Sequence, residues 1–198
     1  MSHSHGSCRA FVSGCSGHHL TAAEKEFFKS TSPWGLILFK RNLLEPSQIK
    51  YLIQEFRDCV GRPDAPVLID QEGGRVQRLG PPHWRRYPAA QHYLEATRGD
   101  VKQAEDLARL GARLIAHDLY DLGFTINCAP TLDLGFEGRT DAIGDRTFAR
   151  DPEAVIRLGR AFAEGLLAGG VLPAIKHMPG HGSATVGRHK ALPRVDVP

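Results

Sequence analysis

The segment PVLIDQEGGRVQRL, residues 66–79, contains an apolar run that ends abruptly at charged and glycine residues. The run is apolar on both faces, which is typical of a parallel strand covered on both sides. Four more runs of this kind are AFVSG (10–14), WGLILF (34–39), FTINCAP (124–130) and VLPAIK (171–176). With amphipathic stretches between them, they predict five repeated βα units around a parallel sheet.

The amphipathic stretches between the runs begin at residues that commonly start helices. These start signals are Thr21 with Glu24, Pro46, Asp100, and Asp151 with Pro152. In the third stretch, apolar residues at helical spacing run from Ala104 through Leu107 and Leu114 to Ile115 and predict one buried face. No internal repeat or linker divides the pattern, which therefore predicts one α/β domain.

The composition excludes several classes of protein. The chain has 198 residues, 41% hydrophobic and 24% charged, as a soluble globular domain or part of a larger one does. Its net charge of +3 is scattered, which gives no support to nucleic-acid binding. Neither a signal peptide nor a membrane-spanning segment is indicated. The four cysteines lack CxxC spacing, which predicts reduced thiols and a cytoplasmic location.

Two long irregular stretches follow strand ends, where parallel α/β folds build their sites. The first begins after Asp70, which either contacts a polar ligand or forms an ion pair with a nearby arginine that fixes the loop. The second runs from Pro130 to Arg150 and contains Arg146. Arg146 either forks onto a ligand or clamps the loop to Asp133 or Asp141, and the sequence slightly favours the clamp.

A third polar stretch, KHMPGHGSATVGRHKALP (176–193), follows the last predicted strand. Its histidines suit proton transfer at neutral pH. His177, His181 and His189 could alternatively bind zinc, but an HxxxH pair needs a helix. Pro179 and the flanking glycines argue against a helix here. We therefore predict no metal site.

Taken together, five ordered motifs resemble glycoside hydrolase family 3. The motifs are FKRN, LIDQEGGRVQRL, INCAPTLDL, IGDRTFARDP and KHMPGHGSATVGRHKALP, and they extend from about Val12 to Leu192. The resemblance is greatest to the single-domain β-N-acetylglucosaminidases of bacterial cell-wall recycling. It implies a (β/α)8 TIM barrel and a retaining hydrolase that needs no cofactor. Its substrate would be a terminal β-linked N-acetylglucosaminide, notably in a muropeptide.

The resemblance also assigns roles to individual residues. It gives sugar binding to a set of five polar residues and proton donation to a histidine, where most glycosidases use a carboxylic acid. The sugar-binding set is Asp70, Arg78, Arg146, Lys176 and His177, and the proton donor is His189.

Two departures from the family pattern bear on activity. An aspartate usually stands two residues before the catalytic histidine and orients it, but here that position is Gly187. A complete barrel needs about 250 residues. We therefore expect residues 1–198 to form an incomplete TIM barrel, about the first five βα units, truncated at its C-terminus. The nucleophilic aspartate is expected beyond Pro198.

These departures predict negligible turnover by the 198 residues alone. The alternative to a hydrolase is a catalytically inactive sugar-binding or regulatory remnant. A dinucleotide-binding enzyme lacks its glycine fingerprint. The sequence leaves the oligomeric state open.

Overall fold

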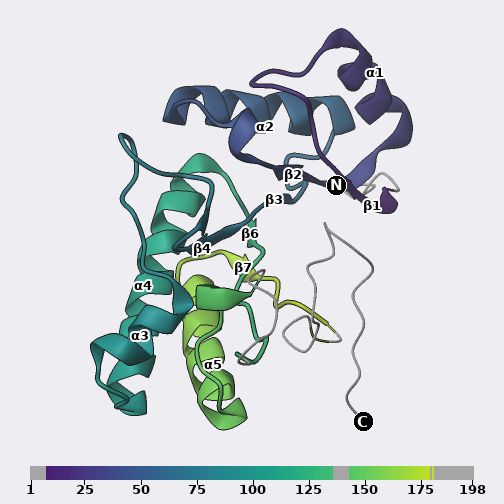
Figure 1. Cartoon of the computed structure of the whole chain (residues 1–198). Helices are drawn as coiled ribbons and strands as arrows, with labels where there is room; N and C mark the ends of the chain where they lie inside the picture. The colour runs from purple at the N-terminus through teal and green to yellow at the C-terminus, as the bar shows by residue number, and fades with distance from the viewer. Residues whose placement is uncertain (1–7, 136–142, 179, 181–198) are drawn as a thin grey trace.

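The computed structural model describes residues 8–135, 143–178 and 180. These residues form one curved parallel sheet with helices on its outer side (Figure 1). Its strands are β1 (Arg9–Ser13), β2 (Pro33–Leu38), β3 (Val67–Ile69), β6 (Ile126–Asn127) and β7 (Leu172–Pro173). All five predicted strands are therefore confirmed. The strands β1 and β2 begin one residue before their apolar runs and have the same length, whereas β3, β6 and β7 are shorter than theirs.

The order of the strands in the sheet follows their order in the chain, β1-β2-β3-β6-β7, and every neighbouring pair is parallel. A doubly wound sheet reverses its strand order at a switch point, whereas a barrel wall does not. The described sheet has no such reversal. Its topology is that of part of a (β/α)8 barrel wall, as the resemblance implied.

The longer helices begin where the sequence predicts. They are α1 (Ala22–Thr31), α2 (Pro46–Val60), α4 (Val101–Leu122) and α5 (Pro152–Ala168). Thr21 and Glu24 form the predicted capping box, and the side chains of Asp100 and Asp151 each accept a hydrogen bond from a backbone N–H in the first turn. None of the described helices is both long and apolar enough to cross a membrane.

The first irregular stretch contains ordered structure that the sequence did not predict. A short antiparallel hairpin, β4 (Gln71–Gly73) with β5 (Val76–Gln77), follows β3 directly, and α3 (Ala90–Ala96) comes before α4. Gly73 and Gly74 have φ angles of 98° and 57°. A Cβ atom on either would collide with residues 87–89. The two glycines therefore let residues 87–89 of the same chain pack closely against the hairpin.

The second stretch, from Pro130 to Arg150, is largely irregular where the structure describes it, as predicted. Its only regular element within the described residues is η2 (Gly144–Arg146), a short 3₁₀ turn. A similar turn, η1 (Lys40–Asn42), follows β2.

The core lies between the sheet and the helices, and two predictions about burial need correction. Leu107 and Leu114 were expected on the buried face of α4, but they are 42% and 37% exposed. Ala104, Ala108 and Ile115 form the buried stripe instead. The narrow alanine face lets α5 pack closely along α4, which leaves the leucines on the flank beside α3.

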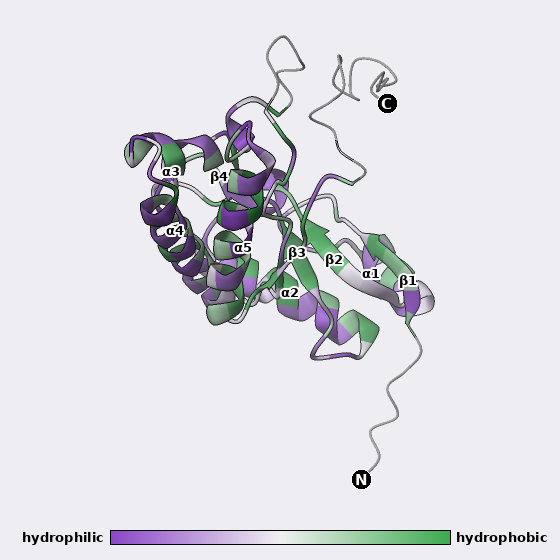
Figure 2. Cartoon of the chain, turned by 90° about the horizontal axis from the view of Figure 1, so that it is seen from below, coloured by the Kyte–Doolittle hydropathy of each residue, from purple (hydrophilic) through white to green (hydrophobic). Residues whose placement is uncertain are grey.

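The outer strands are also less covered than predicted. Val12 of β1 is 38% exposed and Leu172 of β7 is 56% exposed. Each of these strands has one sheet neighbour in the part of the chain that the structure describes. Figure 2 shows apolar residues on β1, β2 and β3, and both polar and apolar residues along the helices around them.

The contact between α4 and α5 depends on Gly165. A Cβ atom there would meet the backbone carbonyl of Arg109 and would lie 2.8 Å from the Cβ of Ala112. We expect Gly165→Ala to lower the free energy of unfolding by about 1–3 kcal/mol, because a backbone carbonyl cannot rotate away. This loss should appear although alanine is the better helix former by about 1 kcal/mol.

Gly159→Ala in the same helix is the matched control. Its new Cβ would meet the tip of the Leu132 side chain, which can change rotamer. Urea denaturation of the two variants measures the difference. Equal stability of both variants would show that α4 and α5 are not packed as described.

Candidate functional site

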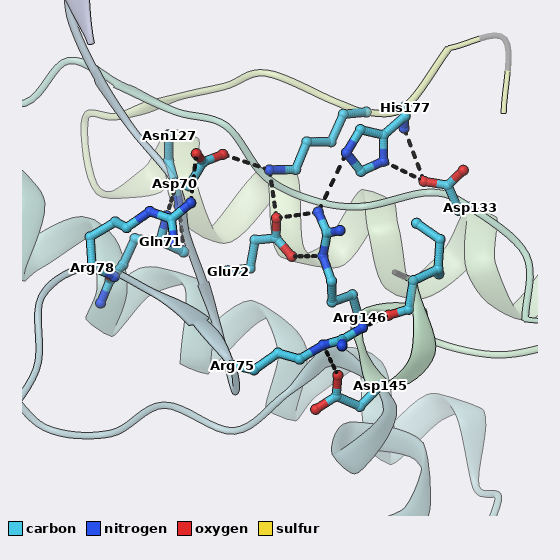
Figure 3. A network of polar contacts seen from close by, with 12 residues as sticks. Asp70, Gln71, Glu72, Arg75, Arg78, Asn127, Asp133, Asp145, Arg146 and His177 are labelled. Carbon is cyan, nitrogen blue, oxygen red and sulfur yellow. Dashed lines mark hydrogen bonds and ion pairs between the residues drawn. The ribbon is translucent and has the colours of Figure 1, made fainter. Parts of the chain in front are cut away.

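Polar side chains converge at the carboxyl ends of β3, β6 and β7 (Figure 3). Asp70 follows β3, Asn127 ends β6, and Lys176 lies just after β7. Because neighbouring parallel strands present their carboxyl ends at one edge, residues more than 100 positions apart come together here. All five residues predicted to bind a sugar belong to this cluster or contact it directly.

Lys176 is the cation at the centre of the cluster. Its Nζ lies 2.7 Å from Oδ1 of Asp70 and 2.5 Å from Oε1 of Glu72. The other oxygen of Asp70 lies 3.2 Å from Nη2 of Arg78. The ion pair between Asp70 and an arginine that the sequence analysis considered is thus present, and Lys176 shares the same carboxylate.

Arg146 reaches the cluster from η2 and forks onto Glu72. Its Nε and Nη2 each donate a hydrogen bond of 2.8 Å to a different carboxylate oxygen of Glu72. The side chains of Arg146 and Glu72 are both nearly buried. A bidentate pair of this kind fixes orientation as well as position. The favoured alternative, a clamp within the chain, is therefore present. The fork onto a ligand stays a prediction, and Asp141 lies outside the described residues. The partner is Glu72, which the sequence analysis did not propose.

His177 continues the network from Arg146 to Asp133. Its Nδ1 lies 2.6 Å from Oδ2 of Asp133, and its Nε2 lies 3.4 Å from Nη2 of Arg146. Arginine can only donate, so Nε2 acts as the acceptor in this contact and Nδ1 carries the proton donated to Asp133. The backbone N–H of His177 also donates a hydrogen bond of 3.1 Å to Oδ2 of Asp133. These contacts fix the ring on one face of the cluster.

Two buried amides hold the backbone beneath these charges. Gln71 and Asn127 exchange hydrogen bonds between the backbone of the first and the side chain of the second, at 3.0 and 2.9 Å. The side-chain oxygen of Gln71 accepts from the backbone N–H groups of Arg78 and Leu79. The hairpin that carries Arg78 is therefore tied to β6.

The carboxylates of the cluster are held in their charged form. Burial disfavours ionisation of Asp70 and Glu72, but hydrogen bonds and charges from the neighbouring cations outweigh it. The pKa of Asp70 and the pKa of Glu72 therefore lie below their ordinary values of 3.8 and 4.5. With Asp133, three carboxylates face three cations, so the charges of the paired groups balance.

A cysteine nucleophile is excluded at this cluster at neutral pH. Cys128 lies close enough to sense the charges of Asp70, Lys176 and Glu72. Burial, with help from the nearby carboxylates, raises the pKa of its thiol to about 11. The thiol therefore stays protonated, whereas a nucleophilic cysteine acts as the thiolate.

The predicted proton donor, His189, lies outside the described residues, as do His181 and Gly187. The alternative zinc site needs two of these histidines. Within the described residues, no group of three or more His, Cys, Asp or Glu side chains is arranged to hold a metal ion.

Three further residues complete the cluster. Glu72 and Asn127 were not predicted from the sequence, and Asp133 was named only as an alternative partner of Arg146. Glu72, Asp133 and Asn127 are all buried, with exposures of 8%, 4% and 0%. The available signal was a polar residue inside an apolar segment, as in FTINCAP and TLDL. A buried polar side chain needs partners, so such positions indicate a network.

Comparison with known proteins settles the family. The sequence pattern described as "Glycosyl hydrolase family 3 N terminal domain" matches residues 11–198. The chain belongs to glycoside hydrolase family 3. It is 41% identical over 177 residues to a beta-hexosaminidase of Methylococcus capsulatus, and 37% identical over the same length to beta-hexosaminidases of Pseudomonas aeruginosa.

Solved structures of this glycoside hydrolase family have the same fold. NagZ from Neisseria gonorrhoeae, in complex with N-trifluoroacetyl-D-glucosamine, matches with a TM-score of 0.85 and 33% identity. The match covers 94% of this chain and 54% of NagZ. A Paenibacillus β-N-acetylglucosaminidase matches with a TM-score of 0.82 and 31% identity, over 92% of this chain and 34% of its own.

The chain spans about half the length of the curated relatives that it matches: 89% of the chain aligns with 51% of the Methylococcus protein. All the residues labelled in Figure 3 lie within residues 11–198, the part of the chain that the family pattern matches.

The ion pairs of Glu72 with Arg146 and Lys176 predict a contribution to stability that depends on pH. Glu72→Gln should destabilise the fold by about 3–5 kcal/mol at pH 7, because Lys176 and Arg146 keep their charges but lose a buried partner. The pKa of Glu72 is lowered in the folded state, so its contribution is present above pH 4.5 and is lost as the pH falls through its folded pKa.

The gap in stability between wild type and Glu72→Gln should therefore narrow below pH 4.5. Chemical denaturation from pH 7 to pH 3 measures this gap. Glu26→Gln, on the exposed side of α1, is the control for removing a carboxylate. A gap that stays constant with pH would contradict the ion-pair assignment.

Proposed function

We propose that this chain binds the terminal N-acetylglucosamine of a β-linked substrate and that the family activity to which its site contributes is hydrolysis of that linkage. Asp70, Arg78, Arg146, Lys176 and His177 would hold the sugar. The observation that carries this proposal is the charge-balanced cluster at the carboxyl ends of β3, β6 and β7.

The balance of charge favours a neutral, polar ligand. A site with surplus charge attracts an ion of the opposite sign, but here the paired charges cancel. The side chains of Asp70, Arg78, Lys176 and His177 are 16–27% exposed, so some of their polar atoms can reach a ligand. Hydroxyl groups both donate and accept hydrogen bonds, and they suit a surface that alternates carboxylate oxygens with cationic N–H groups.

The relatives support the choice of an N-acetylated sugar. The matched Neisseria protein is described in complex with N-trifluoroacetyl-D-glucosamine, and the Paenibacillus protein is a β-N-acetylglucosaminidase. We extend this substrate class to the present chain. Muropeptides taken up during peptidoglycan recycling would be the natural substrates of this class. The enzyme would act on them in the cytoplasm.

In the proposed mechanism, His189 protonates the glycosidic oxygen as the leaving group departs. A carboxylate nucleophile attacks the anomeric carbon from the other face and forms a glycosyl-enzyme intermediate. His189 then removes a proton from water, which releases the sugar with retention. The family resemblance assigns the nucleophile to an aspartate that is not among these 198 residues.

Gly187 weakens this proton transfer. It leaves His189 without the aspartate that would orient its ring and favour the imidazolium, and neighbouring Arg188 disfavours that charge. General acid catalysis is typically worth about 10²- to 10⁴-fold. Sugar binding without turnover is therefore the second candidate function.

Binding of N-acetylglucosamine is the direct test of the site. We expect saturable binding by isothermal titration calorimetry and a loss of affinity of about 10- to 100-fold in Asp70→Asn. Hydrogen bonds to charged groups contribute about 1.5–3 kcal/mol, and the substitution also leaves Lys176 and Arg78 without their shared carboxylate.

Asp106→Asn, on the exposed face of α4, removes the same charge far from the cluster and should bind like wild type. Absence of saturable binding to the folded wild-type chain would refute the proposed function. Equal affinity of wild type and Asp70→Asn would refute the role of Asp70.

Turnover separates hydrolysis from binding alone. The purified chain should release no measurable 4-nitrophenol from 4-nitrophenyl β-N-acetylglucosaminide at pH 7, because the expected nucleophile is missing and His189 lacks its aspartate. Release that disappears in His189→Ala would contradict this expectation and would place a working acid and nucleophile within the 198 residues.

A further inference from the structure

The ring of His177 lies between a hydrogen-bond acceptor and a hydrogen-bond donor (Figure 3). Its Nδ1 is 2.6 Å from Oδ2 of Asp133, and its Nε2 is 3.4 Å from Nη2 of Arg146. The side chain of Asp133 is completely buried, whereas that of His177 is 25% exposed. A ligand can therefore touch the histidine but not the aspartate, and any effect of Asp133 on a ligand passes through His177.

Backbone contacts bring Asp133 and His177 together. Thr131 and Lys176 form a parallel bridge just beyond β6 and β7, and the backbone N–H of Leu132 donates to the carbonyl of Lys176. The two segments thus run side by side. Oδ2 of Asp133 then accepts hydrogen bonds from both the backbone N–H and Nδ1 of His177. Because one oxygen holds both groups, the ring cannot turn over without losing a contact.

The donor on the other side of the ring is tied to the same aspartate. Thr147 follows Arg146 in the chain, and its hydroxyl donates a hydrogen bond of 2.7 Å to the backbone carbonyl of Asp133. Nη2 of Arg146 already donates to Glu72 over 2.8 Å. Its contact with Nε2 of His177 is longer than the usual hydrogen-bond range of about 2.7–3.2 Å. The lone pair of Nε2 is therefore weakly engaged and can accept from a closer donor.

These surroundings favour the neutral ring with its hydrogen on Nδ1. The carboxylates of the cluster are already matched by its lysine and two arginines, so a charged ring would add a fourth cation. The Nε2–H of a charged ring would also face an N–H of Arg146, and two donors cannot bond to each other. The hydrogen bond at one ring nitrogen determines the state of the other, so Asp133 leaves Nε2 bare.

We propose that Asp133 is a positioning residue that makes His177 a hydrogen-bond acceptor for a hydroxyl group of the terminal sugar. Asp133 keeps the ring hydrogen on Nδ1, which leaves the lone pair of Nε2 for the ligand. The site then selects a sugar that presents a donor at this point, because a fluorine or ether oxygen in its place has no hydrogen to donate. The inference rests on the proposed function, in which His177 contacts the sugar.

The state of the ring can be measured without a ligand. Long-range ¹H–¹⁵N correlation spectra of the ¹⁵N-labelled chain at pH 8 distinguish a protonated ring nitrogen from a bare one. The signals that disappear in His177→Asn belong to His177. We expect a protonated Nδ1 and a bare Nε2 in the wild type. A protonated Nε2 would overturn the proposal.

Variants of Asp133 test whether this residue sets the state of the ring. Asp133→Leu removes the acceptor at similar size, so His177 should then populate the form with hydrogen on Nε2. Asp133→Asn retains an oxygen that can accept and should keep the hydrogen on Nδ1. Asp106→Leu, on the exposed face of α4, should leave the signals of His177 unchanged.

A bare Nε2 in folded Asp133→Leu would show that Asp133 does not set the state of the ring. Thermal unfolding verifies that each variant is folded. If Asp133→Leu does not fold, the wild-type spectrum and the binding of fluorinated sugars still decide the proposal.

Fluorinated sugars test the contact with a hydroxyl group. Isothermal titration calorimetry compares N-acetylglucosamine with its 3-, 4- and 6-deoxyfluoro derivatives. At one of these positions, we expect fluorine to weaken binding to the wild type by about 2- to 10-fold, as loss of one hydrogen bond does. His177→Asn should abolish this penalty, since asparagine keeps an N–H for Asp133 but does not reach the place of Nε2.

The outcomes separate this inference from the proposed function. If every fluorine penalty is the same in the wild type and in His177→Asn, His177 does not accept from a sugar hydroxyl and the inference is wrong. Saturable binding of N-acetylglucosamine would then still support the proposed function. Absence of that binding to the folded wild-type chain would overturn both.

Discussion

Lys176 lies between two carboxylates that the fold would otherwise leave close together in a partly buried space. Its Nζ contacts Asp70 and Glu72, which follow β3, while Lys176 itself follows β7. Two neighbouring carboxylates without a cation would repel each other, and burial would raise the pKa of each. The rest of the cluster depends on this contact, because Glu72 must be charged to accept the fork of Arg146.

The balance of charge in the cluster determines how it could recognise a ligand. In the cluster, each cation is matched by a carboxylate, so directional hydrogen bonds rather than net charge would select the ligand. The hairpin that carries Arg78 is anchored through Gln71 to Asn127 of β6, which holds Arg78 beside Asp70.

Much of the fold could be predicted because its signals are local. An apolar run of five to seven residues indicates a buried strand. Thr21, Asp100 and Asp151 act as helix caps through contacts within a few residues. The hairpin after β3 could not be predicted in this way. Gly73 and Gly74 adopt positive φ angles because residues 87–89 pack against them, and that contact is made only in the folded chain.

The sequence by itself determined the βα pattern, the five strands, the capped helices and the positions where polar residues follow strand ends. The motifs also indicated the family and the residues of the candidate site. Only the tertiary structure decided their partners: Arg146 with Glu72, His177 with Asp133, and Lys176 with Asp70 across a separation of 106 residues. A strand signal depends on neighbouring residues, whereas ion pairs depend on which strand ends the sheet brings to the same edge.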